Sequence, residues 1–296
     1  MTSSRSGLWW GFFGVALFAL SVPLTRSAVD HMSPAFITSG RAIVAALLAI
    51  AFLYFRKQPI PTRRQLLRVL ASGGGVVVGF PLFTGLALQT VPASHAAVVV
   101  GLLPAATAVL SVLRTGERPP LRFWIFAIAG AAAVVVFTAT SHGGFEPLQI
   151  EDLYLLAAVV VTAYGYAEGA LVSREIGSWQ TISWSLVVWS PILLAVTIWS
   201  LVTEPLTADV TDWAAFGYLA VVSMFFAFFA WYRGLAIGPI SSVSQVQLTQ
   251  PVMSILWSAV LLGESITPQV LLGGTVVIAC AALAVRSRLA GATSRG

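Results

Sequence analysis

Long apolar stretches separated by short polar clusters make up most of the chain. Ten stretches can be recognised, each close to the roughly 20 residues that a helix needs to cross the hydrocarbon core of a bilayer. Polar clusters such as 56–59 and 141–144 mark the turns between them. The pattern predicts membrane-spanning helices over residues 8–25, 34–55, 66–88, 93–113, 121–140, 153–172, 180–202, 213–233, 240–262 and 267–286.

A β-barrel does not fit this pattern. Barrel strands alternate polar and apolar residues, whereas runs such as 96–100 and 131–136 are apolar throughout. Helices are the remaining spanning element, because lipid offers no partner to a free backbone group. The first stretch follows Arg5 and is similar to a signal peptide. No stretch typical of a soluble mature domain follows it, so we expect it to remain as the first helix.

Composition supports a membrane protein. Apolar residues make up 58% of the 296 residues and charged residues 9%, where soluble domains carry about 25% charged residues. This excludes a soluble catalytic domain and a large receptor ectodomain. The net charge of +5 does not indicate nucleic-acid binding, because Lys57 and the arginines lie at the ends of apolar stretches. The single cysteine, Cys280, excludes an internal disulfide.

The distribution of charges predicts the orientation. With a cytoplasmic N-terminus and ten spans, fourteen of the sixteen basic residues lie on the cytoplasmic side, Arg26 lies outside and Arg41 lies within a span. Eight of the eleven acidic residues lie outside. Lys and Arg are enriched in cytoplasmic loops, so we expect both termini to be cytoplasmic.

The second half of the chain repeats the first. The segment 85–87 matches 234–236, and an offset of 147 residues aligns further identities downstream. The aligned pairs are Pro92 with Pro239, Ser94 with Ser241, Pro104 with Pro251, Ser111 with Ser258, and Gly116-Glu117 with Gly263-Glu264. We predict an all-α integral membrane domain made of two five-helix repeats, residues 1–145 and 146–296.

Five spans per repeat give the two copies opposite topology. The loop with Glu117 is basic and cytoplasmic in this arrangement, while its counterpart with Glu264 is outside and lacks Lys and Arg. Inverted repeats allow a central site to open to one side of the membrane and then to the other. This feature is typical of secondary transporters.

The repeated motifs resemble those of the EamA-type transporters in the drug/metabolite transporter superfamily. In detail the chain is similar to the bacterial aromatic amino-acid exporters of that family. The resemblance implies a basket of ten helices with spans 1–4 and 6–9 around a central cavity and spans 5 and 10 beside it. It also implies export of small metabolites across the bacterial inner membrane. The resemblance is carried by Gly85-Leu86-Ala87, Pro92-Ala93-Ser94, Pro104 and Gly116-Glu117, and by Gly234-Leu235-Ala236, Pro239-Ile240-Ser241, Pro251 and Gly263-Glu264.

Two prolines lie in the middle of corresponding spans. Pro104 and Pro251 each remove a backbone hydrogen bond and favour a bend. Bent helices at equivalent positions of two repeats point to the substrate site and its moving parts, although a static kink is the alternative. Nearby, span 9 is unusually polar, and Ser244, Gln245 and Thr249 share one helical face. We expect these three side chains to line the cavity, with bonds between helices as the alternative.

Ionisable residues inside spans usually mark function. Arg41 either anchors a substrate carboxylate or reaches back to the membrane surface. His95 is a further candidate for the cavity, and both His95 and Glu168 are candidates for proton coupling. The alternatives are a structural hydrogen bond for His95 and close helix packing around Glu168, between Gly165 and Gly169. Simple facilitated transport without proton coupling stays open.

Aromatic residues are dense, and most are expected to face lipid or the membrane interface. Tyr164, at mid-depth and with a hydroxyl, is the best candidate for a ring that stacks on a flat substrate, followed by Phe83. No nucleotide-binding loop, histidine–glutamate metal motif or cysteine pair is present, so neither a cofactor nor a metal is expected. The expected partners are a small-molecule substrate and the lipid bilayer, without nucleic acid.

The sequence therefore favours a transporter over an enzyme. We expect alternating-access export of small amphipathic metabolites, most of all aromatic or apolar amino acids or related flat compounds. An integral-membrane enzyme acting on lipid or quinone is the alternative, and it would need reactive groups at one depth. A pore-type channel is a third, weaker alternative.

Overall fold

The structure, a computed structural model, describes residues 2–115, 120–141, 148–204, 206–237, 243 and 246–293. Every regular element within these ranges is helical, and helical residues occupy each of the predicted apolar stretches. The elements are α1 (Thr2–Ala19), α2 (Ser21–Ala28), α3 (Pro34–Phe55), α4 (Arg63–Gly73), the π-helix η1 (Gly74–Gly79), α5 (Phe80–Ala87), α6 (Ala93–Val100), α7 (Leu103–Thr115), α8 (Leu121–Ser141), α9 (Ile150–Ile176), α10 (Ser178–Thr203), α11 (Val210–Gly217), the π-helix η2 (Tyr218–Phe226), α12 (Ala227–Ile237), the 3₁₀-helix η3 (Gln247–Thr249), α14 (Gln250–Leu262) and α15 (Pro268–Thr293).

Several of the predicted helices are divided. The first is interrupted at Leu20, between α1 and α2, and the fourth at residues 101–102, between α6 and α7. The third and the eighth each contain a π-helical segment, η1 and η2. Such segments widen one turn of a helix and are frequent at functional sites.

The described helices identify a multi-pass membrane protein. Six helical segments are long and apolar enough to cross a bilayer. Four further apolar helices are shorter, with described ranges of 13 to 16 residues beginning at 93, 121, 247 and 268. The six long segments are Ser6–Ala28, Pro34–Phe55, Arg63–Ala87, Ile150–Ile176, Ser178–Thr203 and Val210–Ile237.

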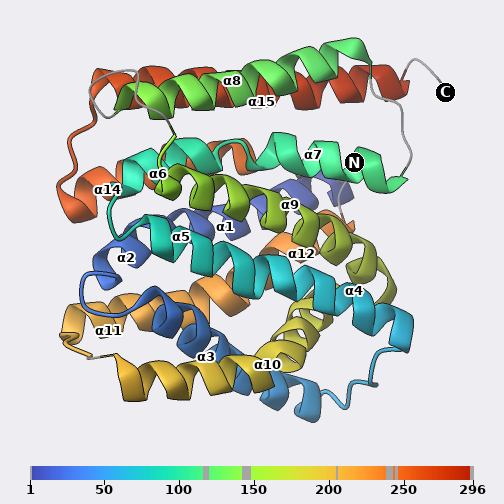
Figure 1. The fold of residues 1–296 in the computed structure, drawn as a ribbon. Coiled ribbons are helices and arrows are strands. Elements are labelled where there is room, and N and C mark those ends of the chain that lie inside the picture. The colour runs from blue at the N-terminus through green and yellow to red at the C-terminus, as the bar shows by residue number, and fades with distance from the viewer. Residues whose placement is uncertain are drawn as a thin grey trace.

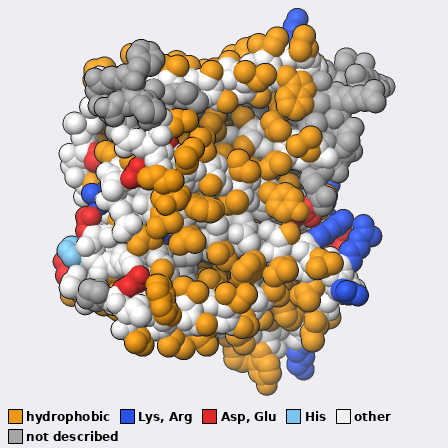
Figure 2. Space-filling view, in the orientation of Figure 1, with side chains coloured by type: hydrophobic (Ala, Val, Ile, Leu, Met, Phe, Trp, Pro, Cys, Tyr) orange, Lys and Arg blue, Asp and Glu red, His pale blue; other side chains and the backbone are white. Residues whose placement is uncertain are grey.

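The surface agrees with a lipid environment. Large side chains such as Leu47, Ile192 and Leu272 are more than half exposed, and apolar side chains cover the middle of the face in Figure 2. In the same view, most Lys and Arg side chains gather at one end of the bundle and most acidic side chains at the other (Figure 2). This face of the molecule therefore has an apolar middle between two polar ends of different charge.

The helices run roughly side by side between these ends. The start of α1 and the end of α15 lie at the same end, which we call the termini end (Figure 1). The opposite end carries the turns that follow α2, α5, α10 and α14 (Figure 1). Helices α8 and α15 pack against each other along one side of the molecule (Figure 1). On the other side α3 packs against α10, and between these two pairs α1 packs against α12 (Figure 1).

Glycines allow two of the helix crossings to be very close. A Cβ atom on Gly75 would lie 2.2 Å from the backbone oxygen of Val161 and 3.0 Å from Cα of Gly165. A Cβ on Gly14 would lie 2.8 Å from the backbone nitrogen of Trp231. The third predicted span thus touches the sixth, and the first touches the eighth, backbone to backbone. Small residues at such crossings are typical of membrane helices.

Candidate functional site

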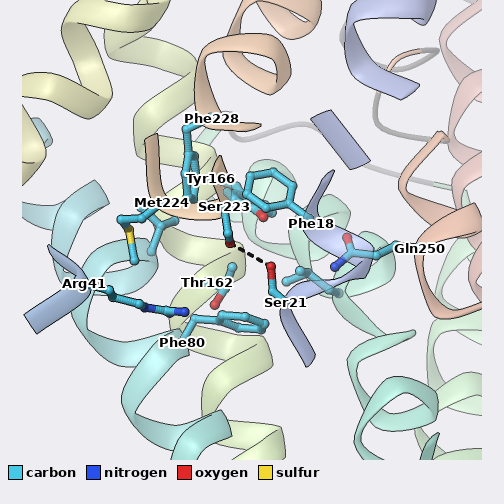
Figure 3. Close-up of a pocket in the computed structure, with 12 residues that line it drawn as sticks. Phe18, Ser21, Arg41, Phe80, Thr162, Tyr166, Ser223, Met224, Phe228 and Gln250 are labelled. Carbon is cyan, nitrogen blue, oxygen red and sulfur yellow. Dashed lines mark hydrogen bonds between the residues drawn. The ribbon is translucent and has the colours of Figure 1, made fainter. Parts of the chain in front are cut away.

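A cavity lies between the helices in the middle of the bundle. It holds about 430 Å³ of space between atoms, its opening included. Its walls come from both halves of the chain, and Figure 3 shows them converging on one volume. The lining residues are Phe18, Ser21, Arg41, Val76, Phe80, Leu103, Thr162, Tyr166, Ser223, Met224, Phe228 and Gln250.

Arg41 is the charged residue of this lining. Helix α3 begins at a fixed point because Ser33 accepts a hydrogen bond from the backbone N–H of Phe36 (3.1 Å) and Pro34 occupies the first turn. Arg41 follows seven residues later, about 10 Å along the helix axis. Its side chain is 4% exposed and extends toward Phe80 and Thr162 in Figure 3.

Arg41 has no counter-charge in the part of the chain that the structure describes. None of the ion pairs there includes it, and its Nε atom is buried without a hydrogen-bond partner. A buried charge is unfavourable unless it is paired. The guanidinium is therefore available to an anionic group that enters the cavity.

Polar atoms without partners also lie in the lining. Thr162 Oγ1 and Gln250 Oε1 are buried and make no hydrogen bond. The hydroxyls of Ser21 and Ser223, in contrast, pair with each other at 2.7 Å, as Figure 3 shows. Buried polar atoms are nearly always satisfied, so those of Thr162 and Gln250 point to a ligand or to water.

Aromatic rings form much of the remaining wall. Phe18 and Phe228 meet edge to face with their centroids 4.8 Å apart, and Tyr166 lies 6.4 Å from Phe228. Phe80 faces them across the cavity in Figure 3. Rings arranged in this way contact flat apolar groups through both their faces and their edges.

The two mid-span prolines lie at helix breaks beside the cavity. Pro104 is buried in the first turn of α7, directly after the break at residues 101–102. Pro251 is buried in the first turn of α14, directly after η3. The breaks approach each other, because a Cβ on Gly101 would lie 3.3 Å from the ring of Pro251. The predicted bends are thus present as breaks that meet near the cavity.

Buried or half-buried contacts hold the opposite end together. The Glu264 carboxylate accepts hydrogen bonds from the backbone N–H groups of Ala93 (2.8 Å) and Ser94 (2.9 Å), at the start of α6. His95 Nε2 lies 2.9 Å from the Asp152 carboxylate, and both side chains are buried. These contacts tie the first half of the chain to the second on this side of the cavity.

Exposed contacts predominate at the termini end. Arg68 pairs with the partly exposed carboxylate of Glu175 at 2.6 Å and lies 4.0 Å from Glu168, which is buried. Gln180 donates a hydrogen bond to the Gln58 side chain at 3.2 Å. Glu168 therefore lies beside a cation, and neither Glu168 nor His95 is among the cavity-lining residues.

Three other predicted site residues, Phe83, Tyr164 and Thr249, are not among the residues that line the cavity. Phe83 is half-buried and stacks on Tyr154, with centroids 6.3 Å apart. Tyr164 is 38% exposed, because it lies almost half a turn of helix away from Tyr166. Thr249 is exposed and donates to the backbone oxygen of Val246. Ser244 and Gln245 lie outside the described residues.

Some lining residues were not singled out from the sequence. On α9, Thr162 and Tyr166 follow the spacing of one helical face together with Gly165 and Gly169. Small residues and hydroxyls on one face of an apolar helix mark the side that meets other helices. This signal favours Tyr166 over Tyr164.

The described residues offer no site for a metal ion. No group of three or more His, Cys, Asp or Glu side chains comes together within them. The polar groups of the cavity are instead the Arg41 cation and neutral hydroxyl and amide groups, which can donate and accept hydrogen bonds. Such a set is suited to an organic molecule with a negative charge and hydrogen-bonding groups.

Comparisons with known proteins agree with this arrangement. The transporter YdeK of Bacillus subtilis is 43% identical over 97% of this chain and 99% of its own length. The "Probable terminal-alkyne amino-acid exporter" of Streptantibioticus cattleyicolor is 27% identical over 92% of this chain and 91% of its own. A solved crystal structure shares the fold, with a TM-score of 0.66 over 95% of this chain and 98% of that one, at 20% identity.

The family match decides the class of the protein. The EamA-like transporter family matches two successive segments, residues 5–139 and 149–286. These relatives are transporters rather than enzymes, which removes the alternative of an enzyme acting on lipid or quinone. This chain, a multi-pass membrane transporter, belongs to the EamA-like transporter family.

Proposed function

We propose that this transporter exports small amphipathic metabolites, most of all aromatic or apolar amino acids or related flat compounds, through the central cavity. The proposal rests on one observation: the cavity is lined both by Arg41, a buried cation without a counter-charge in the described structure, and by aromatic rings. Arg41 provides the anchor that an amino acid needs for its carboxylate. The rings of Phe18, Phe80 and Phe228 provide the contact area for a flat side chain.

The names of relatives support this class of cargo. The S. cattleyicolor protein is named as an amino-acid exporter, and a Salmonella typhimurium relative is named as an amino-acid metabolite efflux pump. Both are similar to this chain over 90% or more of its length. An amino-acid cargo agrees with the carboxylate anchor at Arg41.

We propose alternating access between two inverted repeats, residues 1–145 and 146–296, as the mechanism. Three features support it. The family matches the chain twice in succession. The third and eighth spans both contain a π-helix. The fourth and ninth spans are both broken beside a proline, at Pro104 and Pro251. Paired irregular helices in corresponding positions are what such a mechanism uses.

The proposed location is the bacterial inner membrane, with both termini cytoplasmic. The basic termini end in Figure 2 would then face the cytoplasm, in agreement with the positive-inside rule. Facilitated transport needs no further group. Proton coupling would have to act from outside the cavity, because His95 is paired with Asp152 and Glu168 lies beside Arg68.

Transport by purified protein in liposomes tests the proposal. Labelled phenylalanine or tryptophan is expected to cross faster than in empty vesicles, with saturation and with acceleration by unlabelled substrate on the far side. A pH gradient, applied in a parallel series, separates proton coupling from facilitated flow. Rates equal to those of empty vesicles, over a broad panel of amino acids and dyes, would contradict the proposal. Transport without saturation would indicate a channel.

A further inference from the structure

The charge of the described cavity lining is of one sign only, which is positive. Arg41 supplies a positive charge, and no Asp or Glu is among the lining residues that the structure describes. A zwitterionic amino acid carries one negative and one positive group. The cavity therefore offers a charged partner to the carboxylate of such a ligand and none to its ammonium group.

The neutral polar atoms do not require a charged ligand group. Gln250 Oε1 and Thr162 Oγ1 are buried acceptors without partners. A hydroxyl, an amide N–H or a water molecule satisfies such an acceptor as well as an ammonium does. An ammonium group would exchange its water shell for these acceptors and the faces of the aromatic rings, with no carboxylate in the described lining to balance its charge.

The rest of the lining favours a ligand whose remaining part is flat and apolar. Beyond the polar atoms, the cavity is walled by aromatic rings together with Val76, Leu103 and Met224. In Figure 3 the guanidinium of Arg41 lies beside the ring of Phe80. A carboxylate bound at Arg41 would thus place an attached apolar body among the rings.

We infer that the cavity recognises its cargo by the carboxylate and does not need the ammonium group. This inference rests on the proposed export function and narrows its substrate class. The cargo class is flat apolar monocarboxylates, of which aromatic amino acids are a subset. Net-negative members bind about as well as their zwitterionic counterparts, and analogues with an amine in place of the carboxylate bind poorly.

Four small probes with the same phenyl ring separate the contribution of the carboxylate to binding from that of the ammonium group. Phenylalanine carries both charges, 3-phenylpropanoate the carboxylate alone, phenethylamine the amine alone, and 3-phenylpropanamide neither. Binding to the purified full-length protein in detergent is measured by titration calorimetry. We expect 3-phenylpropanoate to bind no more than about threefold more weakly than phenylalanine. The amine and the amide are expected to bind at least tenfold more weakly, since a charge-assisted bond to Arg41 is lost.

Arg41→Gln tests the anchor, and Arg233→Gln is the matched control. Arg233 is exposed, stacks over Trp10 with its guanidinium 5.3 Å from the ring centroid, and does not line the cavity. Arg41→Gln is expected to lower the affinity for both carboxylate probes at least tenfold and to leave the affinity for 3-phenylpropanamide unchanged. Arg233→Gln is expected to change none of the affinities.

A stability readout distinguishes a binding role from a structural one. Because the buried charge of Arg41 is unpaired, its removal is expected to raise the melting temperature of the ligand-free protein. The same change is expected to abolish the rise in melting temperature that 3-phenylpropanoate gives to the wild-type protein. A structural role for Arg41 would lower the melting temperature of the ligand-free variant.

The outcomes separate this inference from the proposed function. Binding and transport of phenylalanine without binding of 3-phenylpropanoate would leave the proposed function in place and overturn the inference. So would undiminished carboxylate binding by Arg41→Gln, or phenethylamine binding equal to that of phenylalanine. Binding of none of the four probes would overturn the inference and the amino-acid cargo together.

Discussion

The bond between the Glu264 carboxylate and the start of α6 makes a prediction that can be worked out in free energy. The carboxylate accepts two backbone N–H groups, those of Ala93 and Ser94, at 2.8 and 2.9 Å. It also lies at the positive end of the helix dipole. A hydrogen bond to a charged group contributes about 1.5–3 kcal/mol.

Glu264→Gln replaces the charge by a single neutral acceptor. One bond is weakened and the other is lost, because the amide NH₂ cannot accept. The expected cost is about 1.5–3 kcal/mol, which corresponds to a tenfold to roughly hundredfold change in an opening equilibrium. The change should be confined to the start of α6, because the carboxylate acts on these two amides.

Hydrogen exchange with mass spectrometry measures this opening directly. A peptide that covers residues 90–97 is expected to exchange two amides tenfold to roughly hundredfold faster in Glu264→Gln than in the wild type. Glu151→Gln is the matched control, since Glu151 lies at the same end without a hydrogen bond in the described structure. Unchanged exchange in Glu264→Gln, or an equal change in Glu151→Gln, would refute the reasoning.

Three further predictions concern packing, a buried pair and pH. Gly75→Ala is expected to cost about 1–3 kcal/mol in an SDS unfolding titration, because the new Cβ would lie 2.2 Å from the Val161 oxygen; Gly217→Ala, with nothing within 4 Å, should have little effect. Asp152→Asn removes the anionic partner of His95 at 2.9 Å and is expected to cost about 1–3 kcal/mol in the same titration; an equal effect of changing the exposed Asp30 to Asn would argue against a special role for the buried pair. The pKa of Asp209 is lowered because its carboxylate accepts the backbone N–H groups of Asp212 and Thr211 at the start of α11. Its stabilisation is therefore complete above the unfolded value of 3.8 and lost as the pH falls through the lower folded value; exchange of the first amides of α11, corrected for the intrinsic rate, should rise there in the wild type but not in Asp209→Asn.

The helices were predictable because lipid imposes a simple rule. A segment that crosses the hydrocarbon core must be apolar, about 20 residues long and helical. Each predicted stretch accordingly falls on helical residues. The breaks at Pro104 and Pro251 were also predictable, since proline lacks the N–H that a continuous helix needs. The break at Leu20 and the π-helix η1 are likewise followed closely by a proline, Pro23 and Pro81. The π-helix η2 contains no proline and carries no comparable signal.

The cavity was harder to predict than the helices. Arg41 could be singled out from the sequence because an ionisable residue inside a span is rare and usually faces the interior of the bundle. The rings were mostly missed, since many aromatic residues are present and the rotation of each helix decides which of them point inward. Phe80 lines the cavity, whereas Phe83, three residues later, stacks on Tyr154 outside the lining. That rotation depends on contacts between backbones, such as Gly75 on Val161, which sequence periodicity does not specify.

The contacts named above that join the two halves of the chain differ, between the two ends of the bundle, in their sensitivity to dissolved salt. At the termini end, the Arg68–Glu175 pair is partly exposed and is screened by mobile ions. At the opposite end, the His95–Asp152 pair is buried and the Glu264 bonds are half-buried, so the same ions have little access to them. Rising ionic strength should therefore loosen the contacts between the two halves at the termini end first. These contacts would respond to the salinity of the compartment that bathes the termini more than to that of the other compartment.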